Sequence, residues 1–241
     1  METRNDQETR DAWVRYGMAA LCLTAFITGC SATQQVPVTQ TDLKCGFLGT
    51  ACDRLTPGEK GQAALRYLNP NANWTQYNKV IIDPVTFWGG DTEKISAADQ
   101  QTLVNYFNQV LHENLSKKFQ IVDQPGQGVM RLQVALTDAE AATPGLRSIS
   151  VVIPQARTLN TLKYLATGTY AFVGDAQAEM KLTDSVSGQV LAEAVDRRVG
   201  GGALSTAAQW EWGDAENAMK EWATQLTERM SSWTSGAVKP A

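Results

Sequence analysis

The sequence predicts an α+β fold, in which two main helices pack on one face of a mixed, mostly antiparallel sheet after a cleaved lipoprotein signal peptide. Apolar and polar residues alternate in segments around 130–136 and 172–182, which is typical of half-buried strands. Apolar residues recur at helical spacing in two other segments, one after Ser96 and one after Asp214. Helices separated by runs of antiparallel strands are typical of the α+β class.

An apolar run over residues 16–28 follows Arg10 and Arg15 and contains no charge. It is shorter than the about 20 residues needed to span a bilayer, but it has the length of a signal-peptide core. It ends in Ile27-Thr28-Gly29-Cys30, the pattern of a bacterial lipoprotein signal peptide. We therefore expect Cys30 to be acylated and to anchor the protein, since several acyl chains hold a protein stably at about 0.8 kcal/mol per buried methylene. A buried N-terminal helix with a chance cysteine is the alternative.

Four segments are expected along the chain: a signal peptide (1–29), a lipidated flexible tether (30–44), a single periplasmic α+β domain (45–235) and a disordered tail (236–241). The residues after Cys30 are small, polar and unpatterned, as in a flexible tether. Ser31, rather than an aspartate, follows the lipidated cysteine, and this favours sorting to the outer membrane.

Composition and cysteine usage exclude several classes of protein. The formal net charge is −4 at pH 7, and without an excess of basic residues we expect no nucleic-acid partner. Once Cys30 is lipidated and the signal is removed, Cys45 and Cys52 remain, and in an oxidising compartment they predict a disulfide. Half of a metal site is the alternative, but metal pairs are usually closer and His112 is the single histidine, so we expect no metal and no cofactor.

In the first half of the domain, residues 80–87 are expected to form a buried strand that Pro84 interrupts. Ser96 is expected to cap a helix, because Asp99 follows three residues later and an apolar stripe comes next. A short strand at 119–123, a turn at 124–128 and an alternating strand at 130–136 are expected to follow. The apolar stripe consists of Leu103, Tyr106, Phe107, Val110, Leu111 and Leu115.

In the second half, a less regular segment at 147–168 indicates a short strand and one or two helical turns. From residue 172 the alternation resumes, with a hairpin turn expected at 184–188 and a returning strand at 189–199 that glycines interrupt. Asp214 is expected to cap the final helix. Polar side chains on the first of these strands are expected to face solvent or a partner: Asp175, Gln177, Glu179 and Lys181.

Several short blocks together resemble a known family. They are Gly46-Phe47-Leu48, Tyr77-x-Lys79-Val80 leading into Ile82-Asp83-Pro84-Val85, Leu136-Thr137-Asp138-Ala139-Glu140, Gly174-Asp175-Ala176-Gln177-Ala178-Glu179 with Leu182-x-Asp184-x-x-Ser187-Gly188, and Asp196-Arg197-Arg198 before glycines. Over residues 45–233 this combination resembles a family of bacterial lipoproteins known as domain of unknown function 3313. The resemblance implies a secreted, lipid-anchored domain, and it implies neither an activity nor catalytic residues. Its pattern does not include Cys45 and Cys52, so the predicted disulfide rests on chemistry alone.

Motifs of catalysis are weak in this chain. No Gly-x-Ser-x-Gly sequence occurs, and a Ser-His-Asp triad would have to use His112, which lies mid-helix and is better explained as a surface or packing residue. The glycines at 200–202 lack the Lys-Ser/Thr of a phosphate loop. Asp83, Asp91 and Glu93 are candidates for an acid/base pair or a cation site, although turn bonding and solvation explain them more simply. We therefore expect no enzyme activity.

Asp196, Arg197 and Arg198 are consecutive charges on an expected strand, so alternation places Arg197 on the face opposite its neighbours. A structural salt bridge is one interpretation of these residues. Contact with an anionic ligand or a partner is the other, because arginine binds carboxylates bidentately. Trp222 fits the apolar stripe of the last helix, whereas the tryptophans just before it pack on the sheet or contact a protein or membrane surface.

These observations predict a non-catalytic, lipid-anchored protein of the bacterial envelope, in the outer membrane and facing the periplasm. We expect it to contact the membrane through the lipid on Cys30, and another envelope protein through the polar sheet face and the 147–168 segment. The alternative is a module that binds a small ligand or a lipid in a pocket between helix and sheet, and an enzyme is the least favoured class.

Overall fold

The computed structural model describes residues 33–38, 43, 46–88, 95–140, 174–200 and 212–238. The chain divides into two compact units, 1–31 and 32–241, and all described residues belong to the second. The predicted signal peptide, Cys30, Cys45, the 147–168 segment and the candidate carboxylates Asp91 and Glu93 lie outside the described ranges.

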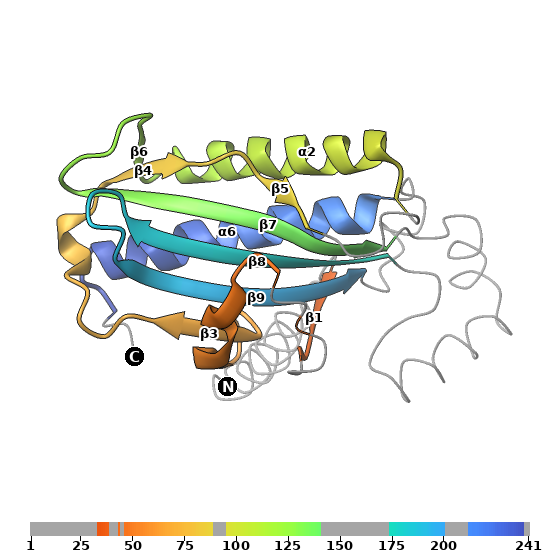
Figure 1. Cartoon of the computed structure of the whole chain (residues 1–241), viewed down its shortest axis with the longest axis horizontal. Coiled ribbons are helices and arrows are strands. Elements are labelled where there is room, and N and C mark those ends of the chain that lie inside the picture. Colours follow the sequence, from red (N-terminus) through yellow and green to blue (C-terminus); the bar gives the residue numbers. More distant parts are fainter. Residues whose placement is uncertain are drawn as a thin grey trace, which may run out of the picture. The chain divides into compact units, whose positions relative to one another are not determined.

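The described strands form one mixed sheet of nine strands in the order β2-β3-β9-β8-β7-β4-β6, with β1 beside β9 and β5 beside β7 (Figure 1). The long strands β7, β8 and β9 are antiparallel, whereas β4 and β5 run parallel to β7, and β6 parallel to β4. The bounds are β1 (Thr33–Val36), β2 (Thr56–Pro57), β3 (Leu65–Leu68), β4 (Lys79–Ile82), β5 (Thr86–Phe87), β6 (Gln120–Ile121), β7 (Val129–Glu140), β8 (Asp175–Asp184) and β9 (Val190–Gly200).

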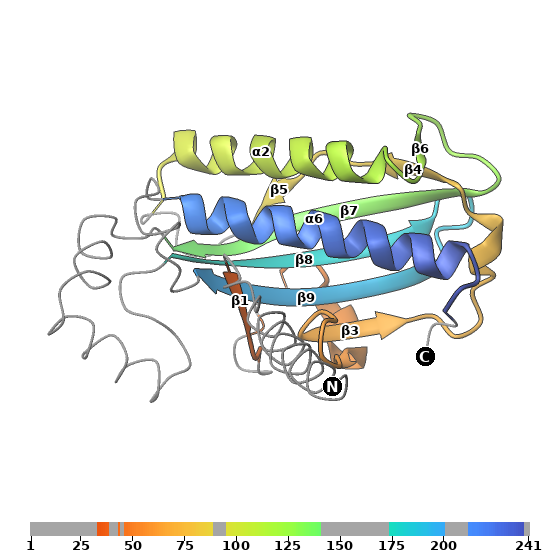
Figure 2. The ribbon, with the colours of Figure 1, turned by 180° about the vertical axis from the view of Figure 1, so that it is seen from behind.

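Two long helices, α2 (Ala97–Leu115) and α6 (Gly213–Thr234), lie side by side over one face of this sheet (Figure 2). Short 3-10 helices, η1 (Gly49–Arg54) and η2 (Trp74–Gln76), occur in the N-terminal half. The predicted α+β class, with a mixed and mostly antiparallel sheet and its main helices on one face, is confirmed.

Helix α2 begins as the sequence predicts. The Ser96 side chain accepts a hydrogen bond from the backbone N–H of Asp99, and the Ser96 hydroxyl also contacts the Asp99 carboxylate at 2.6 Å. The apolar stripe faces the sheet, where Leu103, Phe107 and Leu111 are at most 2% exposed. Pro84 separates β4 from β5, as expected of a residue that has no N–H for the ladder.

The prediction that Asp214 caps the final helix is wrong. The N-cap position is Trp212, with no side-chain capping bond, and Asp214 lies inside the first turn. The buried Asp214 carboxylate instead accepts a hydrogen bond of 2.9 Å from the Gly174 N–H. A Cβ atom on Gly200 would lie 2.3 Å from this carboxyl group, so glycine at the end of β9 makes room for it. Asp214 thus joins the start of α6 to the adjoining ends of β8 and β9.

The two faces of the sheet are both covered. Toward the helices, alternate residues of β7 and β8 join the main core, as the alternation predicts, and β9 adds Leu191 and Ala192. On the other face a second apolar cluster forms between the sheet and the N-terminal segment, comprising Val38, Leu48, Cys52, Leu55, Leu65 and Val195.

This second cluster overturns the expectation that the polar face of β8 is open, except at Lys181, which is only half-buried. Glu179 is 0% exposed and Gln177 is 2% exposed, and the Glu179 carboxylate accepts a 2.9 Å hydrogen bond from the Leu48 N–H. The covering segment has no periodic apolar pattern, so no local signal predicts that it folds over the sheet. Residues 33–36, inside the expected tether, also differ from expectation because they form β1 and pair with β9.

We predict that Ser96→Ala lowers the free energy of unfolding by about 1 kcal/mol, because it removes the acceptor for one N-terminal N–H of α2. Urea unfolding measures this loss. Ser116→Ala is the matched control at the other end of the same helix, where the hydroxyl contacts the Glu113 carbonyl at 3.3 Å. The control should change stability by less than about 0.5 kcal/mol. Equal effects of the two substitutions would contradict the capping role.

Candidate functional site

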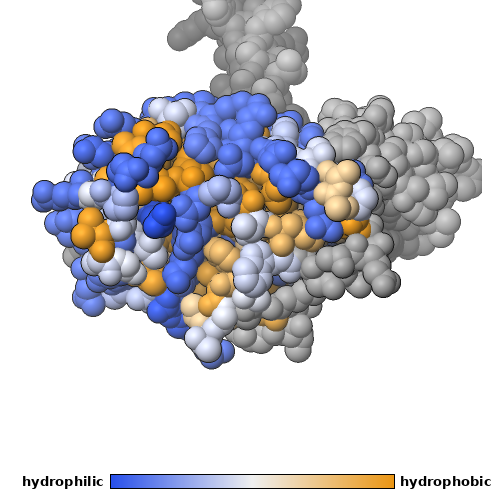
Figure 3. Space-filling model, turned by 45° about the horizontal axis from the view of Figure 1, so that its top comes forward, coloured by the Kyte–Doolittle hydropathy of each residue, from blue (hydrophilic) through white to orange (hydrophobic). Residues whose placement is uncertain are grey.

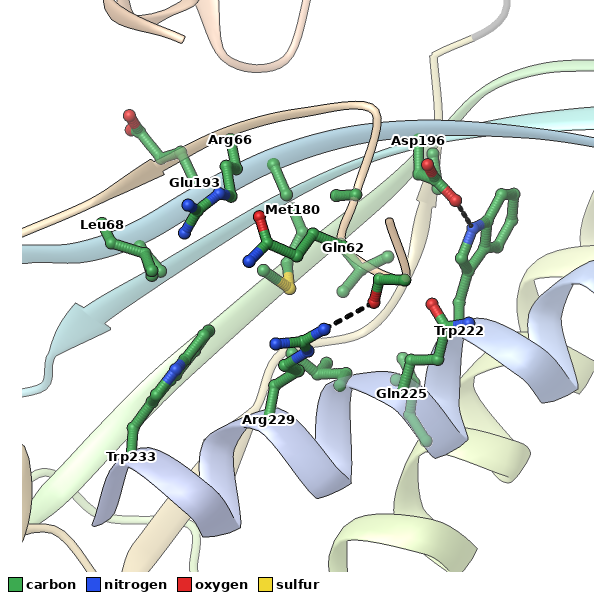
Figure 4. Close-up of a pocket in the computed structure, with 18 of the residues that line it drawn as sticks. Gln62, Arg66, Leu68, Met180, Glu193, Asp196, Trp222, Gln225, Arg229 and Trp233 are labelled. Atoms are coloured by element: carbon green, nitrogen blue, oxygen red, sulfur yellow. Dashed lines mark hydrogen bonds between the residues drawn. The ribbon is translucent and has the colours of Figure 1, made fainter. Parts of the chain in front are cut away.

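A pocket of about 360 Å³ lies between α6 and the sheet, beside the edge formed by β3 and the loop before it (Figure 4). Its sheet side includes Val134 from β7, Ala178 and Met180 from β8, and Ala192 and Ala194 from β9. Its helix side and rim include Trp222, Gln225, Leu226, Arg229 and Trp233 of α6, together with Gln62, Arg66 and Leu68. Most of these surfaces are apolar, with polar groups at the rim.

Short side chains on the sheet explain why a cavity exists here. Protein interiors are normally close-packed, with few voids larger than a water molecule. Ala178, Ala192 and Ala194 reach only one carbon above the backbone of β8 and β9. Trp222 and Trp233 stand at opposite ends of the pocket on α6, and their positions in the helix place them about 16 Å apart along its axis (Figure 4). The helix therefore spans the alanine-lined part of the sheet without filling it.

Both tryptophans are fixed by their neighbours. The Trp222 ring contacts Phe107 of α2 with ring centroids 5.7 Å apart, and Trp233 contacts Trp74 of η2 at 4.9 Å. These packed rings close the two ends of the space between them. The expectation that Trp222 belongs to the helix stripe is confirmed, and Trp212, just before the helix, is also buried at 3% exposed.

The Trp222 end of the pocket contains the predicted site residue Asp196. Its buried carboxylate accepts hydrogen bonds from Trp222 Nε1 at 2.7 Å and from the Ala64 N–H at 2.8 Å, and also from the Gln35 side chain. Burial raises the pKa of Asp196, and these hydrogen bonds together with Arg198 offset part of that rise. This end of the pocket is therefore closed by Trp222 and Asp196, which are hydrogen-bonded to each other.

The other two predicted charges also have partners within the chain. The Arg198 guanidinium is 7% exposed, lies 3.5 Å from Asp196 and 3.9 Å from Glu221 of α6, and donates to the Thr33 hydroxyl at 2.9 Å. Arg197 faces the opposite side of the sheet and forms an ion pair with Asp175 of β8. The predicted alternation of faces is confirmed, and the structure uses these charges to join β9 to β1, β8 and α6.

Two arginines that the sequence did not single out stand at the open side of the pocket. Arg229 of α6 donates a 2.7 Å hydrogen bond to the Gly61 carbonyl, which ties the loop before β3 to the helix. Arg66 of β3 is half-buried, and its Nε atom is buried without a hydrogen-bond partner among the described residues. In Figure 4 both guanidinium groups lie at the pocket, with Met180 between them. Because β3 and α6 are far apart in the sequence, no local pattern could reveal this pair.

The remaining candidate residues do not assemble into a catalytic group in the described part of the chain. Asp83 pairs with Arg131 at 3.1 Å, and His112 lies half-buried on α2. Cys52 is 2% exposed and disulfide-bonded, whereas Cys45 lies outside the described ranges, so their pairing stays a prediction. Within the described ranges no group of three or more His, Cys, Asp and Glu side chains is placed to hold a metal ion.

The outer surface of the described residues provides weaker evidence for a binding site than the pocket does. Figure 3 shows one side of the domain, where apolar residues lie among hydrophilic ones. The large hydrophobic side chains exposed in the described ranges are Trp88, Val186 and Val238, and single exposed apolar residues are normal on protein surfaces. A search of the described helices finds none with the length and apolar character that crossing a membrane requires.

The fold and the pocket define an α+β domain with a helix–sheet cavity, and sequence comparison assigns it to a family. Residues 44–226 match the model of the family "Protein of unknown function (DUF3313)", and the chain belongs to this family, which confirms the resemblance. No curated protein matches the sequence.

Three solved structures of low sequence identity are similar to this chain. A PelC variant dodecamer from Paraburkholderia phytofirmans is 12% identical, with a TM-score of 0.37 over 72% of this chain and 95% of that chain. Protein XCC0632 from Xanthomonas campestris, of family DUF330, is 12% identical, with a TM-score of 0.38 over 70% and 92%. A candidate lipoprotein from Caulobacter crescentus is 13% identical, with a TM-score of 0.33 over 70% and 96%.

We predict that Glu179→Gln makes the domain more stable than wild type at neutral pH. Burial raises the pKa of Glu179 above its usual 4.5, and the hydrogen bonds from the Leu48 and Phe47 N–H groups offset this only in part. The folded state therefore holds the proton more tightly, so the wild type loses stability as pH rises from 4.5 through the folded-state pKa. The gain of the variant should shrink to nothing as pH falls below this window, measured by urea unfolding across pH.

Asp184→Asn is the control of opposite sign. Burial alone would raise the pKa of Asp184, but hydrogen bonds from Ser187, Tyr77 and the Val186 N–H lower it below its usual 3.8. This variant should lose stability at neutral pH, and the loss should fade as pH falls through the folded-state pKa. A stability difference between Glu179→Gln and wild type that does not change with pH would contradict the role assigned to burial.

Proposed function

We propose that this protein is a lipid-anchored protein of the bacterial envelope whose domain binds a single acyl chain in the pocket between α6 and the sheet. The pocket carries the proposal. Its volume of about 360 Å³ falls within the about 300–1,000 Å³ typical of small-ligand sites, and its lining is mainly apolar with a few polar groups at the rim. Binding in this proposal involves no catalytic step.

The shape of the lining suits a flexible apolar chain. Alanines form the sheet side, and Met180, Leu226 and Trp233 form adaptable or flat apolar walls. Each methylene that leaves water contributes about 0.8 kcal/mol. Ala178, Ala192 and Ala194 carry no charge, so an acyl chain can lie against them without leaving a charge of this floor unpaired.

The Cys30 motif supports the envelope location. Lipidation at Cys30 would anchor the protein in a membrane, Ser31 favours the outer membrane, and the domain would then face the periplasm, an oxidising compartment that suits the disulfide expected between Cys45 and Cys52. A membrane-anchored domain is also close to a supply of acyl chains. The partner surface expected on the sheet is covered by residues 46–55, so the pocket is the better-supported site.

We predict that Cys30→Ala abolishes acylation and moves the protein out of the membrane fraction, because it removes the only thiol at the predicted processing site. Fractionation and the mass of the N-terminal peptide measure both effects. Cys22→Ala is the matched control, since Cys22 lies within the segment that should be removed. A Cys30→Ala protein that is still acylated and cleaved after residue 29 would contradict the assignment.

We predict that Ala194→Leu weakens binding of dodecanol at least tenfold, because the larger side chain occupies the alanine-lined floor. Titration calorimetry on the full chain carrying Cys30→Ala, which lacks its own acyl chains, measures the affinity. Ala98→Leu, at an exposed position in the first turn of α2, is the control and should bind as the parent does. No binding by the parent protein, or equal binding by the Ala194→Leu variant, would overturn the proposal.

A further inference from the structure

We propose that the ligand is a single-chain amphiphile with an oxyanion headgroup, a carboxylate or a phosphate, bound by Arg66 while its tail occupies the pocket; this rests on the proposed function and names its ligand class. The inference combines one cation that has no partner among the described residues with the apolar cavity beside it.

Arg66 is placed at the cavity by strand pairing. In the antiparallel pair of β3 and β9, Arg66 lies opposite Ala194, which lines the pocket. Its guanidinium has no ion pair and no hydrogen bond with any described residue, and its Nε atom is shielded from solvent. A shielded donor without a partner is costly, so a ligand that accepts its hydrogen bonds gains affinity.

The acidic groups near Arg66 are held elsewhere. The buried Glu193 carboxylate accepts from Arg54 Nε at 2.7 Å, on the side of the sheet away from the helices. Asp196 accepts from Trp222 and from the Ala64 N–H at the closed end of the pocket. Glu59, which lines the rim, is exposed to solvent, where its charge is screened. The cation at this rim is therefore free to bind an anion brought by a ligand.

Arg229 adds a second group on the opposite side of the opening. Its Nη2 donates to the Gly61 carbonyl, and a guanidinium has further N–H donors in the same plane. Figure 4 shows the Arg66 and Arg229 side chains approaching the same space from β3 and from α6. Arginine recognises carboxylates and phosphates bidentately, so this pair suits an oxyanion.

The position of the cations relative to the apolar surface selects an amphiphile over a free anion. Leu68 and Met180 lie near the two guanidinium groups in Figure 4, Leu226 also lines the pocket, and none of these three side chains donates a hydrogen bond to an anion. An inorganic oxyanion would leave this surface unfilled. An acyl chain with an anionic end satisfies both parts of the site at once.

The test compares dodecanoate, dodecyl phosphate, dodecanol and inorganic phosphate by titration calorimetry at neutral pH, on the full chain carrying Cys30→Ala. We expect the two anionic amphiphiles to bind about ten- to hundredfold more tightly than dodecanol, the range for charge-assisted hydrogen bonds. Adding Arg66→Gln should reduce their affinity to near that of dodecanol measured on the same variant. The ratio of dodecanoate to dodecyl phosphate affinity identifies the headgroup.

Two further variants control the result. Arg131→Gln removes an arginine that pairs with Asp83 and does not line the pocket, and it should preserve the preference for anions. Arg66→Lys keeps the positive charge but loses the planar guanidinium, so it should retain part of the preference for anionic amphiphiles. This variant also tests the role of Arg66 if Arg66→Gln does not fold.

Three outcomes would overturn the inference: dodecanol binding as tightly as the anionic amphiphiles, an anion preference that survives Arg66→Gln, or inorganic phosphate binding as tightly as dodecyl phosphate. The first two of these leave the acyl-chain proposal intact. Absence of binding by all three dodecyl probes would instead overturn the proposed function itself.

Discussion

Strand β9 has charged side chains on both faces of a sheet that is covered on both sides, and the surrounding elements are arranged to partner them. Removing one partner of a buried ion pair costs about 3–5 kcal/mol, because the other charge is left without compensation. Each covering element therefore has to be positioned to within hydrogen-bond distance, which apolar contact alone does not require. The partners come from every side: Arg54 of η1 for Glu193, Asp175 of β8 for Arg197, Trp222 of α6 for Asp196, and Glu221 of α6 for Arg198.

The same strand creates the cavity. Next to its charged positions, β9 presents Ala192 and Ala194 to the helices, and β8 adds Ala178. Trp222 is fixed by Asp196 and Phe107, so α6 cannot settle onto these small side chains. The polar contacts that fix the helix therefore also preserve the space beneath it, which explains how a cavity persists in an interior that would otherwise close-pack.

Because the second face of the sheet is covered, this face is not an open docking surface for another protein. A polar strand face would be a natural docking site for another protein if it were open, but η1 and the residues around it occupy that face and bond to Glu179 and Glu193. Both carboxylates accept a hydrogen bond within the chain, whereas the Arg66 guanidinium at the pocket makes none with a described residue. Function in this domain is therefore better sought inside the fold, at the helix–sheet cavity, than on the flat face of the sheet.

The sequence by itself determined the elements whose signals are local. Alternation defines β7 and β8, and the hairpin turn after β8 indicates the returning strand β9. The Ser96 cap and the apolar stripe define α2, and the match to the DUF3313 family model identifies the family. The tertiary structure decided what depends on distant residues. Thr33–Val36 and η1 have no periodic pattern, so their place on the sheet follows only from pairing with β9 and bonding to buried carboxylates. Asp214 serves as a link to Gly174 rather than as a cap because Gly200 leaves space beside it. The pocket and the Arg66–Arg229 pair exist only because folding brings β3 next to α6, and no local pattern records that approach.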